Sequence, residues 1–340
     1  MESRCGVVLS VEEMSEAGEA RRRVARMAHE LGFDETDAGR VALVATEMAG
    51  NLAKHTGGRG GRMLAQPRLR GGVAGVELLA LDTGPGISDL GEALRDGYST
   101  AGSPGTGLGA ISRVADEWDI HSQPGAGTAV LARLWPRSTP APPAAAVEVG
   151  SVMRPMPGED VCGDGWAVRA HPGGVQLLVV DGLGHGPGAA EASGEAMRAF
   201  HAHPGLAPAE MLRRLHDALR GTRGAAAAVA DLDAERGEVR FAGVGNIAGA
   251  AIGHEEERSM VSMSGIVGHH FRRAQEFSYP WPPGALVILH SDGLGSRWSL
   301  GGYPGLLARD PSLVAGVLFR DLARDSDDAT VVVARRGGRA

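Results

Sequence analysis

The sequence contains few cysteines and few aromatic residues, which limits the kinds of metal site, cellular compartment and hydrophobic core that it can have. Its 340 residues include only Cys5 and Cys162, which lie far apart and lack the spacing of a metal site. This usage is typical of a reducing compartment, so we expect a cytoplasmic protein. Aromatic residues make up 4% of the chain and hydrophobic residues 43%, so small aliphatic side chains must fill the core.

Long apolar runs and basic clusters are also missing. No run reaches the roughly 18 apolar residues that a membrane helix needs, and the N-terminus lacks the pattern of a signal peptide. The net charge is −7, which disfavours nucleic-acid binding because phosphate neutralisation requires clustered Lys and Arg. We therefore expect neither membrane nor nucleic acid as a partner. The length predicts two domains.

Two glycine clusters stand out in the first half. Asp82 ends a strand-like apolar run and is followed by Thr83 and a Gly-Pro-Gly sequence that ends at Gly86. A second cluster, Gly105–Gly109, opens a helical pattern. Glycine lets backbone approach a ligand closely, and a helix N-terminus favours phosphate. Either cluster alone could be only a turn. The two together, the first led by Asp82, are a much more specific indication of a ligand site.

A helix predicted from about Thr36 to Lys54 carries polar residues on one side. Glu47, Asn51 and His55 are spaced four apart and therefore project in the same direction. One interpretation is a solvated polar face. The other is that Asn51 holds a divalent cation against ligand phosphates while Glu47 acts as a base.

These segments resemble a known superfamily. Glu47–Asn51, Asp82–Gly86 and Gly105–Gly109 are similar to the N, G1 and G2 boxes of the GHKL ATPases and kinases. Asp96–Thr100 and Gly125–Thr128 resemble the RsbT-type serine kinases of bacterial stress signalling in particular. The resemblance covers essentially the first 136 residues.

That resemblance implies a GHKL-type α/β sandwich that binds Mg²⁺ and ATP. In such a domain Asn51 would ligate Mg²⁺, Glu47 would be the catalytic base for a substrate hydroxyl, and Asp82 would accept from the adenine amino group. The remaining implied nucleotide contacts are Gly84, Gly86, Gly105, Gly107, Gly109 and Thr128. Nucleotide binding carries over more firmly than kinase activity, because a domain of this fold can bind ATP or a protein without transferring phosphate.

Residues 137–147 are rich in proline and alanine and show no periodic core pattern. This composition predicts an extended, semi-rigid linker between domains 1–136 and 148–336.

Acidic residues follow or precede apolar strands throughout the second half. They are Asp164, Asp181, Asp292 and the adjacent pair Asp327 and Asp328. Each one alone could be a turn that ends a strand. If the strands bring them to one sheet edge, their repulsion requires compensating cations, and oxygen ligands suit Mn²⁺ or Mg²⁺.

This pattern resembles the PPM metal-dependent protein phosphatases, within them the SpoIIE-like branch and its compact RsbX-like form. It implies a PPM-type αββα sandwich with two Mn²⁺ or Mg²⁺ ions between the sheets. The implied ligands are Asp164, Asp181, the backbone carbonyl of Gly182, Asp292 and Asp327, with Asp328 as the competitor for the last position. Glu159 is a candidate for the outer shell, and His185 for assisting the leaving group or for a structural role in its loop.

Together the two halves predict a bifunctional, partner-switching signalling enzyme. A serine/threonine kinase-like domain that binds Mg-ATP would be fused to a metal-dependent phosphoserine/phosphothreonine phosphatase, and STAS-type regulator proteins would be the clients. The alternative is a phosphatase whose first domain only binds ATP or sequesters a partner protein. The sequence leaves the oligomeric state open, and a DNA-binding regulator is poorly supported by the charge.

Overall fold

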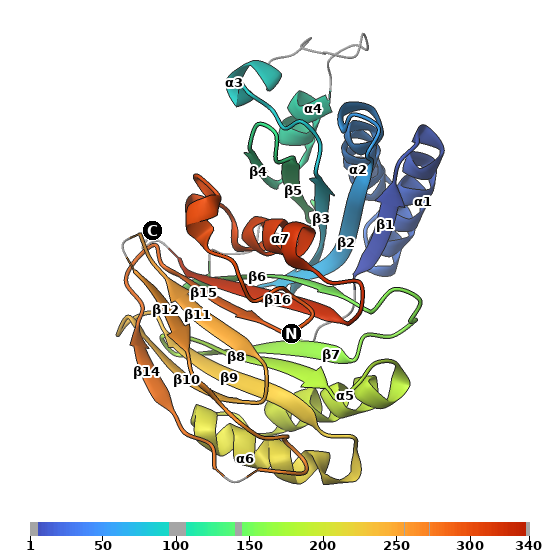
Figure 1. Cartoon of the computed structure of the whole chain (residues 1–340). Coiled ribbons are helices and arrows are strands. Elements are labelled where there is room, and N and C mark those ends of the chain that lie inside the picture. Colours follow the sequence, from blue (N-terminus) through green and yellow to red (C-terminus); the bar gives the residue numbers. More distant parts are fainter. Residues whose placement is uncertain (1–5, 95–106, 140–144, 255, 272, 338–340) are drawn as a thin grey trace. The chain divides into compact units, whose positions relative to one another are not determined.

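The computed structural model describes residues 6–94, 107–139, 145–254, 256–271 and 273–337 (Figure 1). The chain divides into two compact units. The first unit comprises Gly6–Pro143 and a later segment, Tyr303–Arg320. The second comprises Ala144–Gly302 and Asp321–Ala340, together with the first five residues. The fold of each unit is described separately below.

The first unit is built on an antiparallel five-stranded sheet in the order β1-β2-β3-β5-β4. Its strands are β1 (Val7–Val11), β2 (Gly61–Arg70), β3 (Val73–Asp82), β4 (Glu117–Ser122) and β5 (Thr128–Leu134). Its helices are α1 (Met14–Glu30), α2 (Glu35–His55), α3 (Leu90–Ala93) and α4 (Gly107–Val114). The long helices α1 and α2 pack on the sheet, which gives the predicted α/β sandwich (Figure 1).

Apolar periodicity explains why α1 and α2 form and which faces they bury. Val24 and Ala28 of α1 and Val41, Val44 and Met48 of α2 are all buried against the sheet. The carboxylate of Asp34 caps α2 by accepting from the Asp37 backbone N–H at 2.8 Å. The result is a rigid helix that carries the polar residues predicted for the first site.

The segment Tyr303–Arg320 packs within the first unit, although 148–336 was predicted as one domain. It contains the 3₁₀ turn η3 (Leu306–Ala308) and most of α7 (Pro311–Leu322). Every residue from Pro311 to Phe319 is buried, as expected for a helix that is apolar on all sides. Helix α7 approaches β3 closely at Gly316, where a Cβ would lie 3.1 Å from the Leu81 side chain, so a larger residue would require that side chain to shift.

Buried charges attach this segment to the sheet. The Arg133 guanidinium donates to both carboxylate oxygens of Asp310 at 2.7 Å, and its Nε donates to Glu77 at 2.6 Å. The Ser312 hydroxyl donates to the same Glu77 carboxylate at 2.9 Å. Burial alone would raise the pKa of Glu77, but the charges of Arg133 and Arg68 outweigh it and lower the pKa to about 2. Charge pairing rather than apolar contact alone therefore positions this segment.

The second unit consists of two stacked sheets with helices on one of them (Figure 1). One sheet runs β13-β10-β9-β8-β7 with β14 paired to β10, and the other runs β12-β11-β15-β16-β6. The first sheet contains β7 (Asp164–His171), β8 (Gly174–Gly182), β9 (Ala225–Asp233), β10 (Glu238–Val244), β13 (Ser262–Met263) and β14 (Phe277–Pro280). The second contains β6 (Val147–Arg154), β11 (Ala248–Ile252), β12 (Glu257–Met260), β15 (Leu286–His290) and β16 (Ala329–Arg336).

Two cores hold this unit together. Apolar residues of both sheets, including Val179, Phe241 and Val287, form one core between the sheets. The helices α5 (Pro187–Ala202) and α6 (Pro208–Ala218) cover the β7–β10 face and form the other, and 3₁₀ turns lie at η1 (Leu219–Gly221) and η2 (Leu300–Gly302). The predicted fold class, an α/β sandwich followed by a stacked-sheet sandwich, is confirmed. Strand β6 begins at Val147, a residue that the sequence had assigned to the linker.

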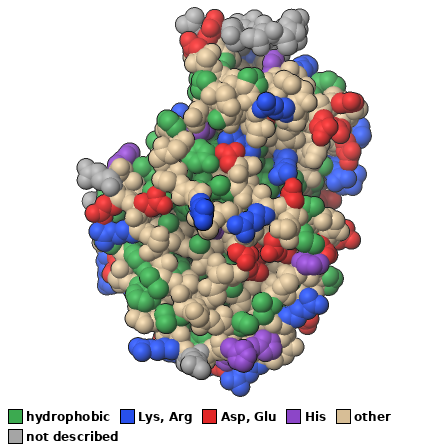
Figure 2. Space-filling model, in the orientation of Figure 1, with side chains coloured by type: hydrophobic (Ala, Val, Ile, Leu, Met, Phe, Trp, Pro, Cys, Tyr) green, Lys and Arg blue, Asp and Glu red, His purple; other side chains and the backbone are tan. Residues whose placement is uncertain are grey.

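Basic and acidic side chains are intermingled on the visible face, and no basic patch dominates it (Figure 2). Across the described residues, no helix is both long enough and apolar enough to cross a membrane.

Candidate functional sites

The first candidate site is centred on Asp82, the last residue of β3. Its Oδ1 accepts from the backbone N–H groups of Gly84 at 2.7 Å and Thr128 at 3.3 Å, so two further predicted residues meet at this carboxylate. Burial raises the pKa of Asp82, although these N–H groups and the charge of Arg320 lower it. A half-buried carboxylate with one oxygen held by backbone leaves the other available as an acceptor.

Close backbone contacts around Asp82 explain the glycines. A Cβ on Gly86 would lie 2.2 Å from the Gln123 carbonyl oxygen, and the φ of Gly86 is +70°. A Cβ on Gly127 would lie 2.0 Å from the Asp82 carbonyl oxygen. Gly127 was not among the predicted site residues, yet it is needed for the strand β5 to approach Asp82.

Helix α2 supplies the polar residues on the other side of this site. Asn51 and Glu47 are half-buried, whereas His55 is exposed. A Cβ on Gly107 would lie 2.9 Å from Asn51 Oδ1, so the start of α4 packs directly over Asn51. Within the described residues, Glu47 has no hydrogen-bond or ion-pair partner, which leaves its carboxylate available.

Two of the predicted nucleotide-binding glycines, Gly105 and Gly109, do not lie in the described loops around Asp82. Gly109 is buried within α4, which begins at Gly107. Gly105 lies outside the described residues, as does the predicted segment 96–100.

The second candidate site lies where strands of both sheets end. Asp164 opens β7 and is the cross-strand partner of Asp181 near the end of β8. Asp292 follows β15, and Asp327 precedes β16. The residue pattern alone suggested the edge of one sheet, whereas the phosphatase resemblance implied a site between two sheets. The carboxylates come from both sheets, as the resemblance implied.

The pKa values of these carboxylates indicate that they influence one another. Burial raises the pKa of Asp164 to about 7, the neighbouring carboxylates add to the increase, and the hydrogen bond from the Ser291 hydroxyl opposes it. Burial and the charges of Asp164, Asp292 and Asp327 raise the pKa of Asp181 to about 8. Such shifts mark a site where several negative charges share little solvent.

Asp327 and Asp328 have different surroundings. The Asp328 carboxylate is 2% exposed and accepts from the backbone N–H groups of Met156 at 2.9 Å and Gly163 at 3.0 Å. Asp327 is half-buried, and its Oδ1 accepts only from the Asp328 N–H at 2.9 Å among the described residues. Asp328 therefore organises backbone, while Asp327 retains an oxygen for a ligand.

Other residues hold the site in ways that the sequence did not indicate. The Ser291 hydroxyl donates to Asp164 Oδ2 at 2.7 Å and so joins the two sheets. The Asn246 amide donates to Asp292 Oδ2 at 2.6 Å, although its segment had been assigned no chemistry. Only their position next to carboxylate strand ends could have identified them.

Two residues that follow Asp181 have clear structural contacts. His185 Nδ1 lies 2.6 Å from Glu159 Oε1, so the candidate outer-shell acid and the candidate histidine contact each other. A Cβ on Gly182 would lie 2.2 Å from the Ala189 carbonyl oxygen, which restricts this position to glycine.

The donor set of the second site fits divalent cations. Asp164 Oδ1 is buried and has no hydrogen-bond partner within the described chain, which is costly unless a cation compensates it. Among the described residues, no three His, Cys, Asp or Glu side chains lie close enough together to hold a metal ion as they stand. Ser291 and Asn246 each take one oxygen of this set, and mutual repulsion of the acids opposes closer approach.

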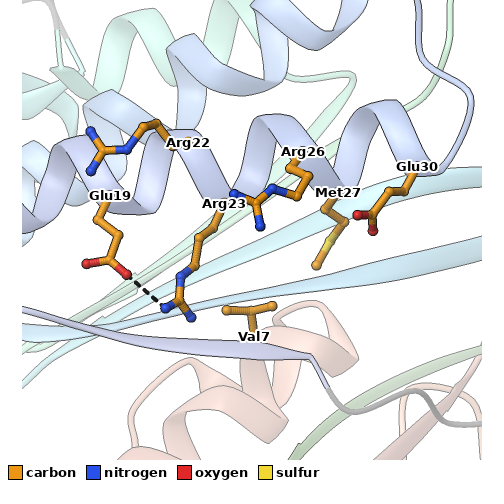
Figure 3. A pocket seen from close by; sticks show the side chains of 7 residues that line it. All are labelled: Val7, Glu19, Arg22, Arg23, Arg26, Met27 and Glu30. Atoms are coloured by element: carbon orange, nitrogen blue, oxygen red, sulfur yellow. Dashed lines mark ion pairs between the residues drawn. The ribbon is translucent and has the colours of Figure 1, made fainter.

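A separate hollow lies along α1 and next to β1 (Figure 3). It has a volume of about 530 Å³ and is lined by Val7, Glu19, Arg22, Arg23, Arg26, Met27 and Glu30. Glu19 pairs with Arg23 at 2.9 Å, and both side chains are about half exposed. None of the predicted site residues lines this hollow.

Comparison with known proteins identifies the first half. The family model "Histidine kinase-like ATPase domain" matches residues 11–134. The serine/threonine-protein kinase RsbT of Bacillus subtilis (strain 168) is 36% identical over 118 residues, which cover 35% of this chain and 87% of that protein. The first half of this chain belongs to the RsbT-type family of histidine kinase-like ATPases.

The second half matches the phosphatase side of the prediction. The family model "Stage II sporulation protein E (SpoIIE)" matches residues 171–337. The phosphoserine phosphatase RsbX of the same Bacillus strain is 25% identical over 140 residues, which cover 40% of this chain and 69% of that protein. The chain is thus an RsbT-type kinase-like domain fused to a SpoIIE/RsbX-type phosphatase domain.

Two solved structures have a similar fold. A chain described under the bacterial stressosome is 31% identical with a TM-score of 0.52, over 56% of this chain and all (100%) of that one. RsbX in complex with magnesium is 18% identical with a TM-score of 0.50, over 58% of this chain and 98% of that one. At this identity the RsbX likeness supports the fold alone.

Proposed function

We propose that this protein both adds and removes phosphate in one partner-switching pathway. The first unit would bind Mg-ATP and phosphorylate a serine or threonine of a STAS-type regulator, and the second would hydrolyse the phosphorylated form. The observation that carries the phosphatase half is the buried, unpartnered Asp164 Oδ1 beside Asp181, with Asp292 and Asp327 at adjoining strand ends.

In the first unit, three side chains would divide the work. The free oxygen of Asp82 would accept from the adenine amino group, since Gly84 and Thr128 already hold the other oxygen. Asn51, next to the start of α4, would hold Mg²⁺ against the phosphates at a helix N-terminus. Glu47, one helical turn earlier and without a partner in the described chain, would take the proton of the substrate hydroxyl.

In the second unit, the acids would hold two Mn²⁺ or Mg²⁺ ions. Bound ions of this kind supply Lewis acidity and an activated water for in-line attack on phosphorus. Asp164, Asp181, Asp292 and Asp327 would hold them, Ser291 and Asn246 would orient two of these carboxylates, and Asp328 would fix the backbone around Gly163.

The test uses the full-length chain and phosphorylated and unphosphorylated STAS proteins from the same genome. With labelled ATP, the wild type should transfer phosphate to the client and then release it, so ATP is hydrolysed continuously. Glu47→Gln should leave the client unphosphorylated, and Asp181→Asn should drive it to full phosphorylation with one ATP used per site. Mass spectrometry of the client from both variants checks that one residue is involved.

A second candidate function keeps the phosphatase but makes the first unit a binding module. It is favoured if Glu47→Gln leaves ATP binding and every measured activity unchanged. Transfer of label by the wild type and its loss in Glu47→Gln would exclude it.

A further inference from the structure

Arg320, at the C-terminal end of α7, contacts the backbone of the predicted adenine-binding residue. Its Nη1 donates to the Asp82 carbonyl oxygen at 3.0 Å. The same carbonyl is the group closest to Gly127, where a Cβ would lie 2.0 Å away. The Asp82 peptide is therefore held by Gly127 and Arg320, while its side chain is held by Gly84 and Thr128.

We propose that Arg320 is a positioning residue for nucleotide binding, and that through it the nucleotide site is coupled to the strand end that carries Asp327. The proposal rests on the nucleotide site described above. Neither half of the proposal follows from the sequence of the kinase-like domain, because Arg320 lies within the phosphatase-family match, residues 171–337.

The first half follows from what Arg320 does to Asp82. A charged hydrogen bond to a carbonyl fixes the peptide orientation, and hence the direction in which the Asp82 carboxylate points. The positive charge also lowers the pKa of Asp82 against the effect of burial, which favours the ionised acceptor. Losing Arg320 should therefore weaken adenine recognition without removing any group that touches the nucleotide.

The second half follows from chain continuity. After Arg320, α7 ends at Leu322, and the Arg324 backbone N–H donates to the Gly293 carbonyl oxygen at 2.8 Å. Gly293 is adjacent to Asp292, and the chain then reaches Asp327 before β16. A shift of the α7 end when nucleotide binds would thus move the backbone of two proposed metal ligands, and the coupling must be reciprocal.

The experiment compares full-length variants by calorimetric titration with ATP and Mg²⁺. Arg320→Gln should bind ATP about 5- to 10-fold more weakly, the size expected for one partly exposed charge-assisted hydrogen bond. Arg320→Lys should recover part of that loss. The matched control is Arg309→Gln, which removes another arginine contact of the same segment, to Asp119 at 3.0 Å, and should stay within about twofold of wild type.

The second readout is hydrolysis of p-nitrophenyl phosphate with Mn²⁺, with and without ATP at a concentration that saturates each variant. ATP should change the wild-type rate, and the change should be absent in Arg320→Gln even when its site is filled. Thermal melts show whether each variant is folded, and Arg320→Lys provides the comparison if Arg320→Gln is not.

The outcomes separate the proposals. If the wild type binds no ATP, both the nucleotide site and the role of Arg320 are wrong. If the wild type binds ATP and the affinity of Arg320→Gln equals that of the wild type or of the control Arg309→Gln, only the proposed role of Arg320 is wrong. Weaker ATP binding in Arg320→Gln with a wild-type phosphatase rate that ignores ATP supports positioning and overturns coupling.

Discussion

At the scale of single residues, the acids of the second site act against stability when no metal is bound. The folded pKa of Asp181 is about 8, compared with 3.8 for an ordinary Asp, so the folded state holds a proton that the unfolded chain has released. Asp164 behaves in the same way with a pKa of about 7. Because these two acids bind more protons in the folded state, their contribution to the free energy of unfolding falls as pH rises from about 4 to about 8.

This gives a prediction in which a site mutation stabilises the protein. In chelator at pH 8, Asp181→Asn should melt at a higher temperature than wild type, while its Mn²⁺-dependent phosphatase activity should be lost. At pH 5 the difference in melting temperature should shrink, because Asp181 is then protonated in the folded state and no longer adds a negative charge to the site. An Asp181→Asn protein that melts lower than wild type at pH 8 in chelator would contradict the electrostatic account.

Substitution of the neighbouring acids Asp327 and Asp328 should affect different properties: activity for Asp327 and stability for Asp328. In the wild type, each carboxylate oxygen of Asp328 accepts a hydrogen bond from one backbone N–H group. Asp328→Asn replaces one of these oxygens with an NH₂ group that cannot accept, so the free energy of unfolding should fall by about 1–3 kcal/mol. Asp327→Asn should leave urea unfolding nearly unchanged and lower metal-dependent activity. Equal destabilisation by both substitutions would show that the two carboxylates do not divide ligand and backbone roles.

At the scale of elements, the contact between α7 and the first sheet depends on a buried charge network. Arg133 and Glu77 are 4% and 0% exposed. Removing Arg133 alone, as in Arg133→Met, leaves Glu77 and Asp310 without their main partner and should cost about 3–5 kcal/mol. Urea unfolding measures this loss, and Arg23→Ala serves as the control, because its pair with Glu19 is half exposed and should contribute less than about 1 kcal/mol.

The elements also show what sequence could and could not predict. The apolar stripes of α1 and α2 and the runs before Asp82 and Asp181 are local signals, and they gave the right elements and the right fold class. The sequence of α7 is apolar on every side, so its pattern predicts a buried helix but not which sheet it covers. That choice depends on the pairing of Arg133 with Asp310, which are distant in the chain.

The same reasoning applies to the sites. Asp82, Gly84 and Thr128 were predicted through family resemblance and lie together. Gly109 lies buried within α4, and its predicted nucleotide contact stays a prediction. Ser291, Asn246 and Arg320 were missed because single polar residues near strand or helix ends carry no sequence signal. Only the three-dimensional structure identifies their partners.

At the scale of the whole molecule, the linker is not the only connection between the two units. Besides the linker, the chain also passes from one to the other after Gly302 and after Arg320. We predict that fragments 1–143 and 144–340, expressed together, will copurify, whereas 144–340 expressed alone will aggregate because its largely apolar helix α7 lacks the sheet with which it forms one unit. Size-exclusion chromatography of each preparation checks this, and co-expression with Asp310→Arg in the longer fragment should abolish copurification.

This crossing of the chain also limits how such a protein can be rebuilt. A chimera that exchanges residues 148–336 for the phosphatase domain of a relative replaces, along with the phosphatase, the helix that covers one face of the kinase-like sheet. The donor must then supply an acid opposite Arg133, a hydroxyl opposite Glu77 and a small residue opposite Leu81, or the recipient domain loses part of its own core. We therefore expect the two domains to be exchangeable only as a matched pair and not as independent modules.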